Sequence, residues 1–404
     1  RDIGVTGVQT CALPILSVTF ARGFRAGAAA AGLKSSDALD VCVVANDGPA
    51  PAAAAVFTSN KVSAAPVRWS QRVVAHADVR AVVLNSGGAN ACTGQQGADD
   101  AAEMAAVTAA HLGLDPIQVA VCSTGLIGVH LPMSKVCTGI AEAVSASAAE
   151  LDAGHAAARA IMTTDSVPKT AQFEAQRPDG TTWRIGGMAK GAGMLAPGLA
   201  TMLVVITTDA AVAPASMQAA LGEACARTFN RLDSDGCMST NDTVVLLSSG
   251  ASGPVDPADF ATAVESVCLN LMHQLQHDAE GSSKDITITV SGAASVAEAE
   301  SAARAIARSA LLKCAVHGED PNWGRVLAAL GTSDAQFDPD RVDVALNGVW
   351  VCRDSQTGAD RSEVVWSGRE VTIDVVLTSG DCAATVWTND LTAMYVHENS
   401  AYSS

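Results

Sequence analysis

A threonine at the head of an apolar run could act as a nucleophile. Thr201 follows Gly198, Leu199 and Ala200 and opens the run at residues 202–207. In the simpler interpretation, the β-propensity of threonine starts a strand here. In the other, the Thr201 hydroxyl attacks the Ala200 carbonyl, and water hydrolyses the resulting ester. The freed α-amine, a group with a pKa of about 7.7–8.0, would then act as a base for the same hydroxyl.

Attack on a carbonyl creates an oxyanion, which needs hydrogen-bond donors. The run Val121-Cys-Ser-Thr124-Gly125-Leu-Ile-Gly128 predicts a strand that ends in a small, turn-forming group. Backbone N–H groups at such a turn are free to donate. The plain alternative is a strand-end turn with no part in the chemistry.

Alternating elements must position these residues. Short apolar, β-branched runs alternate with Ala-rich segments, which predicts an α/β or α+β fold of layered sheets covered by helices. Expected strands cover residues 40–45, 53–58, 80–84, 118–122, 202–207, 242–247, 286–290, 342–345, 371–377 and 383–388. Expected helices cover residues 97–112, 133–151, 214–229, 257–277 and 295–312. Residues 186–200 hold five glycines and a proline, and this predicts a loop packed against protein.

The bulk composition narrows the class of protein. The 404 residues are 49% hydrophobic and 17% charged, as in a globular protein with a buried core. A formal net charge of -17 disfavours nucleic acid and anionic membranes as partners. The eleven cysteines are far apart and contain no Cys-x-x-Cys pair, so we expect mostly buried free thiols in a reducing cytoplasm. No run of 18 apolar residues could span a membrane.

The N-terminal residues differ in character from the rest of the sequence. Residues 5–15, VTGVQTCALPI, look like the translation of a common sequencing-adapter oligonucleotide. We therefore expect residues 1–15 to be non-native and the natural chain to begin near Leu16. Finding this stretch in its genomic context would contradict that expectation.

Seven ordered blocks together closely resemble one family. They are LNSGGANACTG at 84–94, CSTGLIG at 122–128, MTTDSVPK at 162–169, GGMAKGAGMLAP with ATMLVVITTDA at 186–210, STNDTV at 239–244, DPNWGR at 320–325 and the terminal ENSAYSS. The family is ornithine acetyltransferase, also called glutamate N-acetyltransferase, and the resemblance covers nearly everything after Leu16.

The resemblance implies a self-cleaving, N-terminal-nucleophile-like acyltransferase. Cleavage between Ala200 and Thr201 would give an α chain, 16–200, and a β chain, 201–404. Thr201 would be the nucleophile, and Thr124 and Gly125 would form the oxyanion hole. The substrate-binding positions of the family fall on Thr163, Lys190, Thr201, Glu280, Asn399 and Ser404.

The implied reaction is a ping-pong transfer through an acetyl ester of Thr201. N-acetylornithine donates the acetyl group, ornithine leaves, and glutamate takes the group as N-acetylglutamate, a step of arginine biosynthesis. The sequence has no phosphate-loop, dinucleotide-binding or His-Glu-x-x-His zinc motif, so we expect no cofactor and no metal. The resemblance implies an α2β2 heterotetramer in the cytoplasm. Some family members also accept acetyl-coenzyme A as the donor, and the sequence leaves this open.

Several of these residues have an ordinary alternative. Lys190 lies in an apolar, Gly-rich segment, where it could pair with a substrate carboxylate or extend to solvent. Glu280 could hold the distant ammonium of the substrate or be a surface charge after a helix. Asn399 and Ser404 belong to a polar tail that would otherwise be expected to fray.

Two other functions stay open at this point. A similar self-processing amidase or aminopeptidase would resolve the acyl-enzyme with water, so its product formation would not depend on glutamate. A non-catalytic binding protein, in which Thr201 only starts a strand, would stay as one uncut chain of 40.9 kDa.

Overall fold

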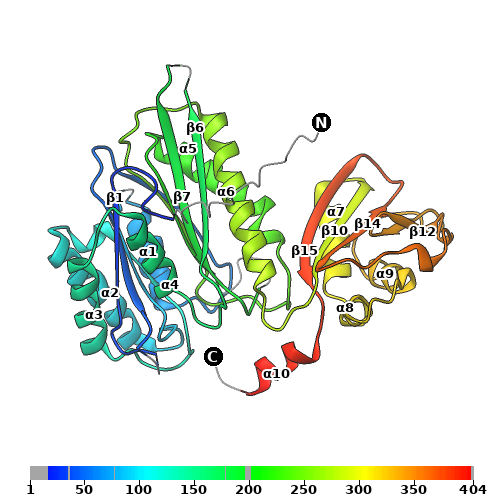
Figure 1. The fold of residues 1–404 in the computed structure, drawn as a ribbon, viewed down its shortest axis with the longest axis horizontal. Coiled ribbons are helices and arrows are strands. Elements are labelled where there is room, and N and C mark those ends of the chain that lie inside the picture. The colour runs from blue at the N-terminus through cyan, green and yellow to red at the C-terminus, as the bar shows by residue number, and fades with distance from the viewer. Residues whose placement is uncertain (1–16, 35–36, 77, 178, 196–201, 402–404) are drawn as a thin grey trace, which may run out of the picture.

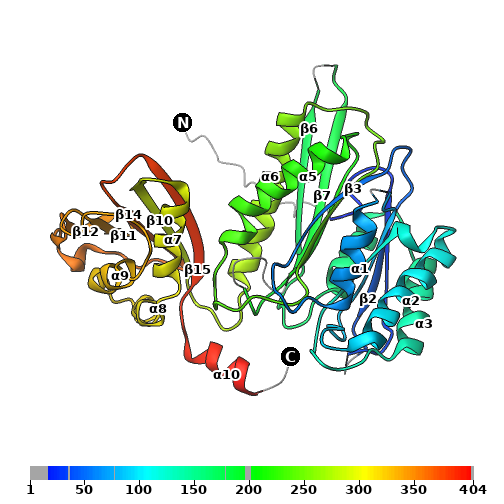
Figure 2. The same cartoon turned by 180° about the vertical axis from the view of Figure 1, so that it is seen from behind.

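Two lobes stand side by side in the computed structural model (Figures 1 and 2). The structure describes residues 17–34, 37–76, 78–177, 179–195 and 202–401. Within them, a four-stranded and a five-stranded sheet build the larger lobe, and a six-stranded sheet builds the smaller one. The predicted α/β class, with layered sheets covered by helices, is confirmed. None of the described helices is long and apolar enough to cross a membrane.

The four-stranded sheet has helices on both faces. Its order is β1 (Phe24–Ala29), β2 (Val41–Asn46), β4 (Ala81–Asn85) and β5 (Val119–Ser123). One set of alternate side chains packs with α2 (Gly94–Leu112) and α3 (Met133–Ser145). The other set faces α1 (Ala65–Val74), α4 (Leu151–Ala160) and the second sheet. Strands covered on both faces carry continuous apolar runs, and this is why their sequences predict them well.

The five-stranded sheet carries the segments that frame the candidate site. Its order is β3 (Ala52–Phe57), β9 (Thr243–Ser248), β8 (Leu203–Thr208), β7 (Thr182–Lys190) and β6 (Lys169–Gln176). Strands β8 and β9 run parallel and the other neighbours antiparallel. The outer face packs on α5 (Pro214–Arg227) and α6 (Pro257–His277).

The smaller lobe is a six-stranded sheet with helices on one face. Its order is β13 (Gln356–Thr357), β12 (Val349–Arg353), β11 (Asp343–Leu346), β14 (Glu370–Val376), β10 (Asp285–Ala293) and β15 (Cys382–Asn389). Helices α7 (Val296–Ala307), α8 (Ala310–His317) and α9 (Trp323–Leu330) complete its core. Short 3-10 helices occur at Pro116–Gln118, Phe229–Arg231 and Arg361–Glu363.

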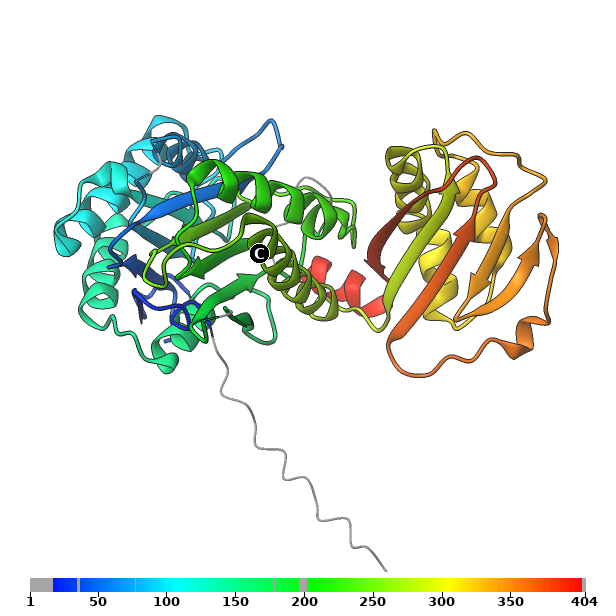
Figure 3. The same cartoon turned by 90° about the horizontal axis from the view of Figure 1, so that it is seen from above.

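The lobes meet where α6 ends. Gln276 of α6 donates to the carbonyl oxygens of Ile286 (3.1 Å) and Thr388 (2.9 Å) in the smaller lobe. Asn389 donates back to the Gln276 carbonyl (2.9 Å). After β15 the chain forms α10 (Ala393–Ala401), which lies between the two lobes when seen from above (Figure 3).

Of the expected helices, one ends earlier than predicted and one is divided in two. The segment predicted as a helix at 133–151 leaves the helical path after Ser145, because Ala148 forms two backbone hydrogen bonds with Ala26 of the edge strand β1. The segment predicted at 295–312 breaks at Ser309, whose hydroxyl accepts the Leu312 N–H and caps α8. Contacts and caps of this kind override helix propensity.

The expected loop at 186–200 is wrong in its first part. Strand β7 continues to Lys190, and Gly186 and Gly187 pair with Thr207 and Ile206 of β8. These glycines serve close packing, since a Cβ on Gly186 would lie 2.1 Å from the Ser17 carbonyl oxygen. The rest of the segment, 196–200, lies outside the described residues.

The cysteines of the described residues are free, as expected, but only partly buried. Five of the ten in the described part of the chain are buried, two are half-buried and three are exposed. The expectation of mostly buried thiols therefore holds for the sheet and helix interiors, where Cys42 and Cys122 lie, and fails for Cys92, Cys237 and Cys314.

Candidate active site

The start of β8 is held by its neighbours on both sides. The predicted nucleophile Thr201, the Ala200 carbonyl before it and Ser404 lie outside the described residues. Met202 donates its N–H to the Asp242 carboxylate (2.9 Å), and its carbonyl accepts the Thr243 N–H (3.1 Å). Leu203 then pairs with Lys190 and with Thr243. The last residue of β7 therefore lies beside the segment that follows the predicted cleavage bond.

Lys190 lies in one cluster with two other predicted site residues, Thr124 and Thr163. Its side chain is almost fully buried, and its Nζ donates to the hydroxyls of Thr163 (2.6 Å) and Thr124 (3.4 Å). An oxygen of Asp165 lies 3.7 Å from the same Nζ. Burial lowers the pKa of Lys190, and the Asp165 carboxylate opposes that effect. The alternative in which Lys190 extends to solvent is wrong.

Thr124 and Gly125 come directly after β5. The Thr124 N–H donates to the Asn85 carbonyl (3.0 Å), so the expectation of a free backbone donor is wrong at this residue. Its buried hydroxyl, which accepts from Lys190, can still donate its own proton. The Gly125 N–H has no acceptor among the described residues. A hydroxyl and one N–H are therefore the two donors that could face an oxyanion.

Gly125 needs to be glycine for two reasons. Its φ is +131°, a region that other residues rarely adopt. A Cβ there would also lie 2.7 Å from the Gly88 nitrogen, because Gly88 and Thr124 form an antiparallel bridge just beyond the ends of β4 and β5. The close approach of these two backbones sets the direction of the Gly125 N–H.

Asn241 and Asp242 support this corner, although the sequence analysis assigned them no role. Asn241 donates its side-chain amide to the carbonyls of Ala89 (2.6 Å) and Ser123 (2.8 Å), which anchors the end of β5. Asp242 accepts the Met202 N–H with one oxygen, while the other is buried without a partner among the described residues. Burial raises the pKa of Asp242 well above its usual value. The available signal was a polar run, STND, that leads into a buried strand.

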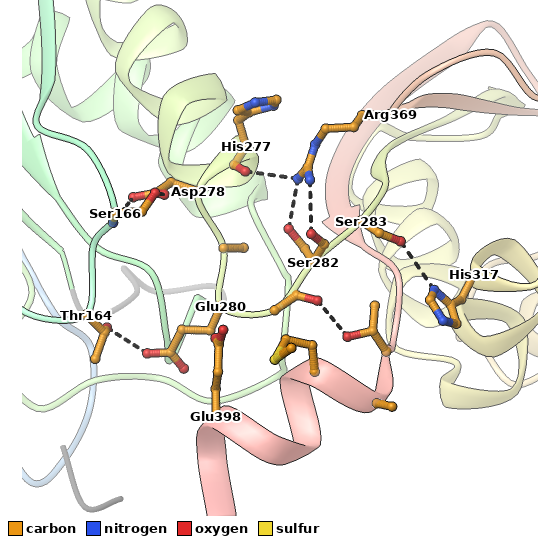
Figure 4. A pocket seen from close by; sticks show the side chains of 15 residues that line it. Thr164, Ser166, His277, Asp278, Glu280, Ser282, Ser283, His317, Arg369 and Glu398 are labelled. Carbon is orange, nitrogen blue, oxygen red and sulfur yellow. Dashed lines mark hydrogen bonds between the residues drawn. The ribbon is translucent and has the colours of Figure 1, made fainter. Parts of the chain in front are cut away.

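Glu280 lies on the other side of the cluster, three residues after the end of α6. Its N–H donates to the Ala192 carbonyl (3.0 Å), and its carboxylate accepts from the Thr164 hydroxyl (2.7 Å; Figure 4). Gly193 leaves room for it, since a Cβ at that position would lie 2.6 Å from the carboxylate. The backbone of Glu280 is thus tied to the chain that continues from Lys190.

Two cavities share the Glu280 carboxylate. The larger, of about 710 Å³, opens between the lobes and is bordered by α10, whose Glu398 extends toward Glu280 in Figure 4. The smaller, of about 260 Å³, is lined by Lys313, Tyr395 and neighbouring acidic residues. A substrate group that reached Glu280 would therefore have access to solvent-filled space on either side of it.

The C-terminal residues form an ordered helix in the described range. Thr392 anchors α10 through a bond from its hydroxyl to the Gly281 carbonyl (2.6 Å), next to Glu280. Asn399, predicted to bind substrate, is exposed, and its amide donates to the Tyr395 carbonyl one turn earlier (3.0 Å). The structure therefore does not bring Asn399 into the Lys190 cluster.

The arrangement presents opposite charges at two ends. The Lys190 ammonium, with the Thr163 and Thr124 hydroxyls, suits a carboxylate or a developing oxyanion. The Glu280 carboxylate suits a cation. Among the described residues, no group of three or more His, Cys, Asp or Glu side chains could hold a metal ion.

Comparisons with known proteins agree with the blocks seen in the sequence. A model of the ArgJ family matches residues 25–404. The chain is 57% identical to the arginine biosynthesis bifunctional protein ArgJ of Thermobifida fusca and 58% identical to that of Streptomyces coelicolor, each over 390 residues, 96% of this chain and 100% of the relative. A solved ornithine acetyltransferase from Mycobacterium tuberculosis, in complex with ornithine, is 50% identical with a TM-score of 0.44, over 47% of this chain and 98% of that one. The chain therefore belongs to the ArgJ family of arginine-biosynthesis enzymes.

Proposed function

We propose that the chain cleaves itself between Ala200 and Thr201 and then uses Thr201 to move an acetyl group from N-acetylornithine to glutamate. The α chain would span residues 16–200 and the β chain 201–404. The observation that supports this most directly is the buried Lys190 ammonium, bonded to Thr163 and Thr124 and paired in the sheet with Leu203, two residues after Thr201.

Lys190 and Glu280 each bind one charged end of the acetyl donor, N-acetylornithine. The α-carboxylate of N-acetylornithine pairs with the Lys190 ammonium, where burial strengthens the interaction. The terminal ammonium of the ornithine side chain pairs with Glu280, and Thr164 orients that carboxylate by donating to it. Thr163, bonded to Lys190 at 2.6 Å, contributes a further hydroxyl beside the carboxylate.

The transfer then has two steps. The Thr201 Oγ attacks the acetyl carbonyl as its proton passes to the Thr201 α-amine, and the Thr124 hydroxyl and Gly125 N–H stabilise the oxyanion. The carbon–nitrogen bond breaks, the leaving amine takes the proton, and the acetyl group stays on Thr201 as an ester. In the second step the α-amine of glutamate attacks the ester, and the Thr201 oxygen leaves and regains a proton.

The acceptor, the assembly and the cellular location of the enzyme belong to the same proposal. Glutamate is the acceptor, the α and β chains assemble as α2β2, and the enzyme works in the cytoplasm. Asn399 and Ser404 complete the substrate site in the assembled enzyme. An assay with acetyl-coenzyme A and glutamate, without N-acetylornithine, decides whether the same site accepts the second donor.

Mass spectrometry of the purified protein beside a Thr201→Ala variant tests the proposal. The wild type is expected as two chains that separate at Ala200–Thr201, and the variant as one uncut chain. With the cut enzyme, N-acetylornithine alone should release a single stoichiometric burst of ornithine as Thr201 is acetylated, and continued release of ornithine should require glutamate. An intact wild-type chain that still transfers acetyl groups, or release of acetate that is independent of glutamate, would overturn the mechanism.

A further inference from the structure

A fully buried lysine lies behind the candidate site and contacts no substrate position. Lys169, at the start of β6, has a side chain with no exposed surface. Its Nζ lies 2.6 Å from an Asp165 oxygen and 2.6 Å from an Asp278 oxygen. These carboxylates are 113 positions apart in the chain, and Lys169 is the group that joins them. The sequence block MTTDSVPK contains two of the three residues, but only the fold brings in the third.

The charges alternate along a chain that leads into the site. Lys190 approaches Asp165 (3.7 Å), Asp165 pairs with Lys169, and Lys169 pairs with Asp278. Two ammonium groups therefore balance two carboxylates in a region with little water. Removal of one member would leave an uncompensated buried charge, which is far less favourable than the complete set.

Each carboxylate also holds backbone that forms the site. Asp165 accepts the N–H of Gly191 (2.6 Å), next to Lys190, and that of Thr163 (2.9 Å). Asp278 accepts the N–H of Ser166 (3.0 Å) and also a bond from its hydroxyl. Asp165 thus secures the Lys190 end of the site.

Asp278 connects the same network to the opposite end. It stands two residues before Glu280, whose carboxylate accepts from Thr164 and whose N–H donates to Ala192. The segment 163–169 therefore lies between Lys190 and Glu280 and is bonded to both sides. Figure 4 shows Ser166 beside Asp278 and Thr164 beside Glu280.

We infer that Lys169 is a positioning residue that fixes the spacing between Lys190 and Glu280, and so sets the preference of the site for substrates with an amine at the end opposite the α-carboxylate. This inference rests on the proposed function, because it assigns the two charged ends to one substrate. A purely structural ion network would stabilise the fold without changing which substrate is preferred. The two roles differ in substrate selectivity.

A comparison of two acetyl donors distinguishes the positioning role of Lys169 from a purely structural role. N-acetylornithine can use both ends of the site, whereas N-acetylnorvaline has the same carbon skeleton without the terminal amine and cannot use Glu280. For Lys169→Met we expect kcat/KM for N-acetylornithine to fall on the order of 10- to 100-fold, as for a displacement of about 1 Å. The value for N-acetylnorvaline should fall much less, so the ratio of the two moves toward one.

Two further variants keep the test decisive. Lys169→Met leaves two buried carboxylates without their cation, and it could fail to fold. Asp278→Ala breaks the connection on the Glu280 side only and should also lower the selectivity ratio, while Asp278→Asn, which can still accept from Lys169, should restore much of it. Lys284→Met is the matched control, since Lys284 is a buried lysine paired with Glu319 outside this network. It should leave the ratio unchanged.

The outcomes are distinct. If the Lys169 and Asp278 variants fold and lose activity equally toward both donors, or keep the wild-type ratio, the positioning role is overturned. If the cut wild-type enzyme does not transfer acetyl from N-acetylornithine at all, the proposed function fails first, and that result appears before any variant is compared.

Discussion

Removal of the Thr124 hydroxyl tests whether this group stabilises the transition state or only contributes to substrate binding. In Thr124→Val the side chain keeps its shape and loses the oxygen that lies 3.4 Å from the Lys190 Nζ. Lys190 keeps its shorter bond to Thr163 (2.6 Å), so its position should change little. Loss of a long, weak hydrogen bond lowers stability by about 0.5–1.5 kcal/mol at most.

The effect on catalysis should be larger than the effect on stability. Loss of one oxyanion-hole donor typically lowers kcat by about 10²–10³, or about 2.7–4 kcal/mol in the barrier. Thr124 is 1% exposed, so little water is available to replace the missing donor. We therefore expect a fall in kcat of that order, with KM for N-acetylornithine close to the wild-type value.

The assay measures ornithine release with both substrates saturating, with kcat calculated per cut chain after quantification on a denaturing gel. Thr124→Ser, which keeps the hydroxyl, is the matched control and should retain most of the activity. A Val variant with kcat within about threefold of the wild type, or a Ser variant as impaired as Val, would refute the role assigned to this hydroxyl.

Two other predictions concern stability. Burial raises the pKa of Asp242 in the folded protein, so the stabilising contribution of this carboxyl is complete below its unfolded pKa and is lost as pH rises through its folded pKa. The variant Asp242→Asn can still accept the Met202 N–H but does not titrate. In urea titrations, its free energy of unfolding should therefore increase relative to that of the wild type between pH 5 and pH 8. An equal difference at both pH values would contradict this. Gly27→Ala would place a Cβ 2.0 Å from the Ala143 carbonyl oxygen and should lower the free energy of unfolding by about 1–3 kcal/mol, whereas Gly222→Ala, with open space around it, should not. Equal thermal midpoints for these two glycine variants would show that β1 can shift away from α3.

The regular elements were predictable because their signals are local. Helix α6 has both of its expected bounds, and most expected strands lie within one or two residues of the observed ones. Several observed elements, among them β1, β6, α1, α4 and α9, were not expected, and the segment wrongly expected as a loop depends on distant partners. Strand β7 needs glycines because Ser17 and Leu271 pack closely against them, and no local pattern distinguishes such a strand from a loop.

The site was predictable in part. The resemblance implied roles for Thr124, Thr163 and Lys190, and the structure brings these three together. The buried network was not predicted, because Lys169 looks like an ordinary charged residue beside a proline, and its partner Asp278 is 109 positions away. Burial of such a charge follows from tertiary packing, which charge type and local spacing do not reveal.

The strand order of the five-stranded sheet bears on what the proposed cut does to the molecule. Strands β8 and β9 come after Thr201, yet they lie between β3 and β7, which come before it. The two products would therefore share one hydrogen-bonded sheet, and their separation would require unfolding of that sheet. Before the cut, unfolding is a reaction of a single molecule; after it, the unfolded state consists of two molecules, so the melting temperature of the mature enzyme would depend on protein concentration. Before maturation, a single chain could refold by itself. After maturation, refolding would require the α and β chains to associate from dilute solution.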